Sequence, residues 1–108
     1  MRIEQEEFQE WNMMIRMLVQ ASLGSISQNM RRVGLHRENG DWVVEVILEK
    51  DNLDEREEIE ELASEFWILS EDNAEGAVSH RVIVDDGPRD NFPKFEGFAG
   101  GIYWRKED

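Results

Sequence analysis

The chain has 108 residues, a net charge of −13 and no cysteine, and 40% of its residues are hydrophobic. These values are typical of one folded domain, so we expect a single domain over residues 1–108. Without cysteine the chain has no disulfide framework, no thiolate nucleophile and no cysteine-ligated metal site. It has no apolar run near the roughly 20 residues that span a bilayer, and its start, MRIEQEEF, is unlike a signal peptide, so we expect a cytoplasmic protein.

The first predicted element is an amphipathic helix over residues 4–23. Its apolar stripe recurs every three or four positions and ends before Gly24, a plausible helix stop. The predicted stripe consists of Phe8, Trp11, Ile15, Leu18 and Ser22.

Residues 30–37 and 42–49 are predicted to form a β-hairpin. They flank Asn39-Gly40, the dipeptide that most strongly favours a two-residue hairpin turn. Such a turn would place Leu35 opposite Val44 on a buried face and Arg37 opposite Trp42, where a cation–π contact can form. The other face of the hairpin is mixed in polarity.

A second helix is predicted over residues 54–69, with Asp51 or Asn52 as its N-cap. At 100° per residue, its apolar side chains fall within one arc, which is typical of a helix packed on a core. That arc contains Ile59, Leu62, Ala63 and Phe66, whereas Asp54, Glu57, Glu58, Glu61, Glu65 and the isolated Ile68 lie on the other side. Trp67 is expected at the boundary between the two sides.

Residues 77–85 alternate like a third strand, the stretch DGPRDNFPKFEGFAGG reads as a long loop, and residues 102–107 read as a last strand. The predicted order is α-β-β-α-β-β. We therefore expect an α+β fold with a mostly antiparallel four-stranded sheet and both helices on one face.

Signals of catalysis are scarce. The two histidines, His36 and His80, stand on predicted strands without a partner motif, and the chain has neither an HExxH nor a GxSxG motif. We expect no catalytic residue, no metal and no cofactor.

The negative charge is concentrated in one part of the chain. Residues 43–75 contain 13 acidic and two basic residues and so account for −11 of the net −13. Such a field repels nucleic acid and anionic membranes and attracts cationic partners. The acidic side of the second helix is either a solvated surface or a binding face for a basic protein. The loop aromatics Phe92, Phe95 and Phe98 either close one end of the core or leave an exposed binding anchor.

The stretch LVQASLGSISQNMRRVGLHRENGDW carries a family resemblance, together with the acidic helix and the end IYWRKE. The chain resembles small acidic bacterial immunity proteins of toxin systems such as contact-dependent growth inhibition. The residues that carry this resemblance are Leu23-Gly24, Asn29, the helix over Asp54–Phe66, and Ile102-Tyr103-Trp104-Arg105-Lys106-Glu107.

The resemblance implies an inhibitor that binds and neutralises a cognate toxin domain. Toxins of this kind that attack tRNA or DNA are commonly basic, so an acidic inhibitor has the complementary sign. The partner-binding residues expected on this hypothesis are Asp54, Glu57, Glu58, Glu61, Glu65, Trp67, Ile68 and Phe95.

Two other hypotheses stay open at this point. The chain could be an acidic nucleic-acid mimic or adaptor that binds a different basic partner, or a small enzyme with an unrecognised carboxylate site. A deep pocket that encloses two acids would favour the enzyme.

Overall fold

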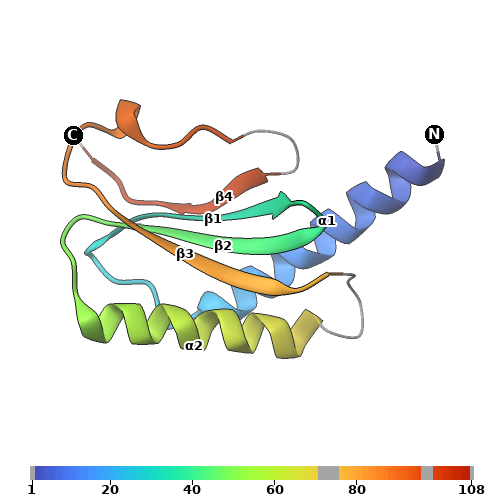
Figure 1. Cartoon of the computed structure of the whole chain (residues 1–108), viewed down its shortest axis with the longest axis horizontal. Helices are drawn as coiled ribbons and strands as arrows, with labels where there is room; N and C mark the ends of the chain where they lie inside the picture. Colours follow the sequence, from blue (N-terminus) through green and yellow to red (C-terminus); the bar gives the residue numbers. More distant parts are fainter. Residues whose placement is uncertain (1, 71–75, 96–98, 108) are drawn as a thin grey trace.

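The computed structural model describes residues 2–70, 76–95 and 99–107, and their side chains from Glu7 onward. Along the chain lie α1 (Arg2–Ser22), β1 (Met30–Glu38), β2 (Asp41–Leu48), α2 (Leu53–Ser70), β3 (Val78–Val84), the short 3₁₀ helix η1 (Arg89–Asn91) and β4 (Ala99–Trp104). The predicted order of α-β-β-α-β-β is confirmed. Both helices lie on one side of the four-stranded sheet (Figure 1).

The hairpin of β1 and β2 forms as predicted. Asn39 and Gly40 both have positive φ, 54° and 84°, as the two central residues of a type I′ turn require. Leu35 pairs with Val44, and Arg37 pairs with Trp42 in the antiparallel register. The guanidinium of Arg37 lies 4.6 Å from the ring centre of Trp42, which confirms the predicted cation–π contact.

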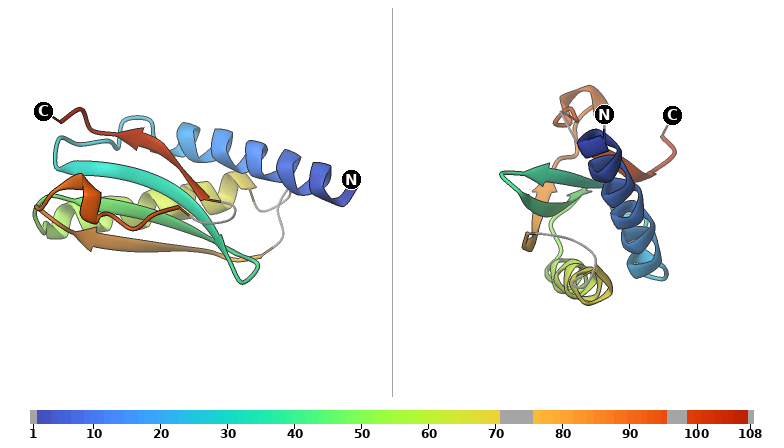
Figure 2. Two further views of the ribbon diagram at one scale, coloured as in Figure 1. Left: turned by 90° about the horizontal axis from the view of Figure 1, so that it is seen from above. Right: turned by 90° about the vertical axis from the view of Figure 1, so that its right-hand side faces the viewer.

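The sheet has the strand order β3-β2-β1-β4, and β2 and β3 run parallel, whereas the other two pairs are antiparallel. A parallel pair needs a crossover connection, and α2 supplies it between β2 and β3. The sheet is therefore mixed and mostly antiparallel, as predicted. β3 and β4 are its outer strands, which Figure 2 shows from above.

The core lies between the helices and one face of the sheet. Alternate strand residues that point to this face are fully buried, among them Val33 and Leu35 of β1 and Val44 and Val46 of β2. Met14 and Leu18 of α1 and Leu62 and Phe66 of α2 pack against them. Phe8, predicted for the stripe of α1, is 57% exposed instead.

The second face of the sheet is covered by the segment 85–95, which includes η1 (Figure 1). Phe92 of this segment is buried beside the guanidinium groups of Arg31 and Arg32, at 4.6 and 5.7 Å from its ring centre. A register shift between Met30 and Arg32 interrupts the pairing of β1 with β2, so the chain carries an extra residue there. The mixed face of the hairpin is thus not solvated but lies under a loop.

The last strand both begins and ends earlier than the predicted residues 102–107. β4 spans Ala99–Trp104, so the glycine-rich start that resembled a loop belongs to the sheet. Gly34 pairs with Gly101, and a Cβ on Gly34 would lie 3.0 Å from the Phe95 ring and 3.1 Å from the carbonyl oxygen of Gly100. Glycine is needed here because a ring and a neighbouring strand approach the backbone closely.

Candidate partner-binding face

Helix α2 is fixed at its start by an N-cap and along its length by the core. The Asn52 side-chain oxygen accepts a hydrogen bond from the backbone N–H of Glu55 at 3.0 Å, which identifies Asn52 as the cap. Ile59, Leu62, Ala63, Phe66 and Ser70 are buried. This arrangement confirms the predicted helical phase and determines which residues face outward.

The outward side of α2 is acidic and open. The predicted carboxylates Asp54, Glu57, Glu58, Glu61 and Glu65 are all exposed. Within the described part of the chain, no ion pair or hydrogen bond involves their carboxylate groups. The arginine of the helix, Arg56, binds Asp51 at 2.5 Å instead. The negative potential of this face is therefore not neutralised by ion pairs with the described side chains.

Two large apolar side chains stand among these acids. Ile68 is 66% exposed and Trp67 is 40% exposed. Ile68 lines a shallow groove of about 620 Å³ along α2 with Glu57, Glu61 and Glu65. An apolar anchor surrounded by charge is a common arrangement in protein interfaces, where the anchor holds the complex and the charges select the partner.

A second groove, of about 430 Å³, lies between α2 and the start of β3. It is lined by Trp67 and Ile68 on the helix and by Val78 and His80 on the strand. Glu60 lines both grooves, although sequence analysis did not single it out. Glu60 stands seven residues, or about two helical turns, before Trp67, so the two side chains lie on the same flank of the helix. This spacing in the sequence could have identified Glu60 as a candidate.

Phe95 lies apart from the other predicted contact residues. Its ring packs 4.3 Å from the guanidinium of Arg32 and 5.3 Å from the ring of His36, on the sheet face opposite α2. It is partly buried and also meets Trp104 edge-on, with ring centres 6.0 Å apart. The structure thus brings together the seven predicted residues of α2 and leaves Phe95 on the loop side.

Beneath that loop lies a buried charge network. Arg32, 2% exposed, donates to Glu45 Oε1 at 2.5 Å and to the Pro93 carbonyl at 2.8 Å. Arg81 donates to the other oxygen of Glu45 at 2.8 Å. Burial acts to raise the pKa of Glu45, but the hydrogen bonds from Arg32 and Arg81 outweigh it and hold that pKa below its ordinary value. Glu45 is therefore a charged structural group.

A small pocket of about 270 Å³ on this side encloses two acids, Glu38 and Glu45, together with His36. The hydrogen bond from Arg81 lowers the pKa of Glu38 as well. A general acid needs a carboxyl group with a raised pKa, and both of these are shifted the opposite way. The pair thus has the properties of an ion-pair network.

The described residues contain no group of three or more histidine or acidic side chains placed to hold a metal ion. None of their helices combines the length and apolar character needed to cross a membrane.

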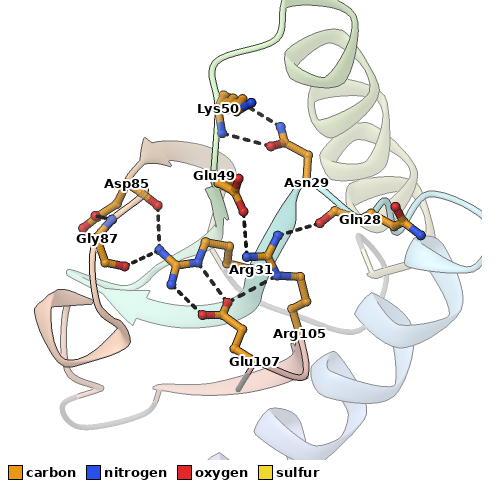
Figure 3. Close-up of polar contacts among 9 residues, drawn as sticks. All are labelled: Gln28, Asn29, Arg31, Glu49, Lys50, Asp85, Gly87, Arg105 and Glu107. Atoms are coloured by element: carbon orange, nitrogen blue, oxygen red, sulfur yellow. Dashed lines mark hydrogen bonds and ion pairs between the residues drawn. The ribbon is translucent and has the colours of Figure 1, made fainter.

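Three residues that carry the family resemblance, Asn29, Arg105 and Glu107, lie away from α2, at one corner of the fold (Figure 3). The Asn29 side-chain amide donates to the Lys50 carbonyl at 2.7 Å and accepts from the Lys50 N–H at 2.9 Å. Arg105 donates to the Gln28 carbonyl and to Glu49, both at 2.8 Å. These residues tie the loop after α1 to the end of β2 and to the C-terminal segment, so their role is architectural.

The same corner holds the start of the covering loop. Arg31 is 5% exposed and binds Glu107, and it also donates to the carbonyl oxygens of Asp85 and Gly87 at 2.8 and 2.6 Å. The hydrogen bond from Arg31 lowers the pKa of Glu107 to about 2. One arginine thus joins β1, the segment after β3 and the C-terminal residues.

Comparison with known proteins gives one family. No curated protein matches the chain. Residues 12–107 match the MafI2 immunity protein family, a span that covers the hairpin, the acidic helix and the C-terminal Arg105-Lys106-Glu107. The chain therefore belongs to the MafI2 immunity protein family.

Proposed function

We propose that this protein neutralises a cognate basic toxin domain, of the nuclease class, by binding it through the outward face of α2. The observation that carries the proposal is the set of exposed carboxylates on α2, around the exposed Ile68, that form no ion pair with the described residues. Family membership supports an immunity role. The basic character of the toxin, its nuclease activity and the binding face are our inferences.

The proposed complex uses two kinds of contact. Carboxylates such as Glu58 and Glu61 attract and orient a cationic surface at long range, which raises the association rate. Ile68 and Trp67 then enter the interface and lose their exposed area, which slows dissociation. Phe95 remains a candidate contact only for a toxin that also reaches the loop side of the sheet.

The protein acts by occupation of the toxin surface and not by chemistry on it. The two carboxylates that share a pocket are held ionised by Arg81, which supports a non-catalytic role. We place this activity in the cytoplasm, where a nuclease toxin would meet its nucleic-acid substrate. Neither direct nucleic-acid binding nor membrane binding is part of the proposal.

A general mimic of nucleic acid is less well supported. Mimicry of a duplex favours carboxylates spread over a broad surface, whereas the unpaired acids described above lie along one helix. The loop side instead presents Arg89 and Lys94 beside Trp104 in a groove of about 500 Å³. A single acidic face fits one dedicated partner better.

The test is a charge reversal on α2 with a control of equal charge. Glu58→Lys with Glu61→Lys should leave the fold intact and weaken protection against the toxin encoded beside this chain's gene. Asp86→Lys with Asp90→Lys changes the net charge equally on the exposed loop and should protect as the unmodified chain does. Protection is measured as survival on co-expression, and binding by surface plasmon resonance with the inactivated toxin. Equal protection by all three proteins would refute the α2 face, and failure of the unmodified chain to protect would refute the proposed function.

A further inference from the structure

Among the described residues, no strand pairs with the outer edge of β3, so its backbone groups are open to another strand. The ends of the β2–β3 pairing are defined by two bonds, from Trp42 N–H to the Ala77 carbonyl at 2.8 Å and from Asp85 N–H to the Leu48 carbonyl at 2.9 Å. Both bonds involve odd-numbered residues, Ala77 and Asp85, which directly flank β3. Since backbone groups alternate in direction along a strand, the N–H and C=O groups of the even-numbered residues point away from β2. These are Val78, His80, Val82 and Val84.

This edge lacks the features that usually block strand addition. Edge strands are commonly protected by proline, lysine, a bulge or short length. β3 has seven residues, VSHRVIV, with no proline or lysine, and it pairs with β2 in an unbroken register. Its single arginine, Arg81, is bound inward by Glu38 and Glu45. The opposite edge, β4, is interrupted by glycines and a register shift.

The free edge adjoins the acidic face of α2. The groove that contains Glu60, Trp67 and Ile68 continues onto Val78 and His80 of β3. A strand added to β3 would direct alternate side chains toward that groove. Basic side chains there would meet Glu60 and its neighbours, and apolar ones would cover Ile68.

We propose that the toxin partner contributes an extended segment with basic side chains that adds to β3 as a fifth strand, so that the sheet edge and the α2 face form one binding surface. This inference rests on the proposed function and specifies how the toxin is held. Main-chain hydrogen bonds to His80 and Val82 fix the segment, and the grooves along α2 select its side chains. A second copy of this chain is a poorer occupant because pairing of two β3 edges would bring two acidic α2 flanks together.

Amide hydrogen exchange by NMR tests the geometry residue by residue. In the dilute free chain, the amides of His80 and Val82 should exchange rapidly, whereas those of Arg81 and Ile83, bonded to β2, should be protected. Addition of the inactivated toxin domain encoded beside this chain's gene should protect His80 and Val82. A complex in which these amides stay unprotected overturns strand addition and leaves the proposed function intact.

Two further outcomes separate the alternatives. Protection of His80 that grows with the concentration of the chain alone, together with a dimeric mass by light scattering, would assign the edge to a second copy and overturn the inference. Failure of the chain to bind the toxin at all would instead overturn the proposed function and the inference with it.

A matched pair of variants provides a second test. His80→Pro removes one outward N–H at an exposed edge position, where proline is compatible with a strand, and His80→Ala removes only the side chain. The proline variant should bind the toxin about tenfold more weakly than the alanine variant, because both lack the imidazole and only the proline variant also lacks the outward N–H. Equal affinity of the two variants, with both melting at the temperature of the unmodified chain, would overturn the inference.

Discussion

Arg31 and Glu107 form a two-bond ion pair across the corner of the fold. The guanidinium Nε and one terminal nitrogen donate to the two carboxylate oxygens at 2.9 and 2.6 Å. The two residues are far apart in sequence, and their side chains are 5% and 16% exposed. This pair makes the C-terminal segment part of the folded structure.

The pair predicts an acid-sensitive contribution to stability. The pKa of Glu107 falls from its ordinary value of 4.5 to about 2 on folding, chiefly through its hydrogen bond with Arg31. A lowered pKa stabilises the folded chain above the unfolded value, and that stabilisation is lost as the pH falls from about 4.5 to about 2. Glu107→Gln should therefore lower the free energy of unfolding by about 1–3 kcal/mol at pH 7, and this difference should shrink below pH 4.5.

Urea unfolding of the two proteins between pH 7 and pH 2.5 measures this difference. Glu58→Gln is the control, because its carboxylate forms no ion pair with the described residues. A loss of stability in Glu107→Gln that is the same at every pH would contradict the ion-pair explanation.

Truncation of a buried side chain of α2 should lower the stability of the fold far more than truncation of an exposed one. Leu62 is 2% exposed and packs in the core, so Leu62→Ala should cost about 2–5 kcal/mol. Ile68 is 66% exposed on the same helix, so Ile68→Ala should change stability by less than about 0.5 kcal/mol. Thermal and urea unfolding give both values, and similar losses in the two variants would show that the helical phase is wrong.

The Ile68→Ala variant also separates stability from binding. Its toxin complex should dissociate faster, because an apolar anchor acts mainly on the dissociation rate. Leu62→Ala should not change the dissociation rate at temperatures where it stays folded.

The buried pair of Arg32 and Glu45 predicts non-additive effects. Glu45→Ala leaves a guanidinium that is 2% exposed without its nearest anion, which should cost about 3–5 kcal/mol. Replacing both residues by methionine removes both charges together and should cost less than Glu45→Ala alone. A double-mutant cycle by urea unfolding measures the coupling, and additive losses would show that the two charges do not depend on each other.

Salt should affect association more than dissociation. The Debye length falls from about 10 Å at 0.1 M salt to about 3 Å at 1 M, which screens the field of exposed carboxylates. The association rate with the toxin should therefore decrease with salt, and more steeply for the unmodified chain than for Glu58→Lys with Glu61→Lys. Stopped-flow measurements at several salt concentrations would show this, and parallel salt dependences would contradict steering by α2.

Much of the fold follows from local patterns in the sequence. Asn39-Gly40 determines the hairpin register, and the 100° periodicity of α2 separates Leu62 from Glu61 and Ile68. These features depend on residues close in the chain, so sequence analysis could predict them. The exposed acidic face was predictable for the same reason.

Other features depend on which distant segments meet. β3 pairs in parallel with β2 because α2 forms a crossover connection between them. The alternation of apolar and polar residues within each strand does not indicate whether the pairing is parallel. The true start of β4 was missed because its glycine-rich start resembles a loop, and its place in the sheet depends on pairing with β1, where Gly101 lies opposite Gly34. The position of Phe95 opposite α2 likewise depends on how the loop folds over the sheet.

The corner around Asn29 and Arg31 has a consequence for how such proteins can diversify. The bonds that hold the covering loop and the C-terminal segment are made by side chains that do not belong to the outward side of α2. Under the proposed function, substitutions on that side alter which toxin is recognised while these bonds remain in place. A lineage of this architecture can therefore follow a changing toxin by surface replacements alone, without compensating changes in its interior.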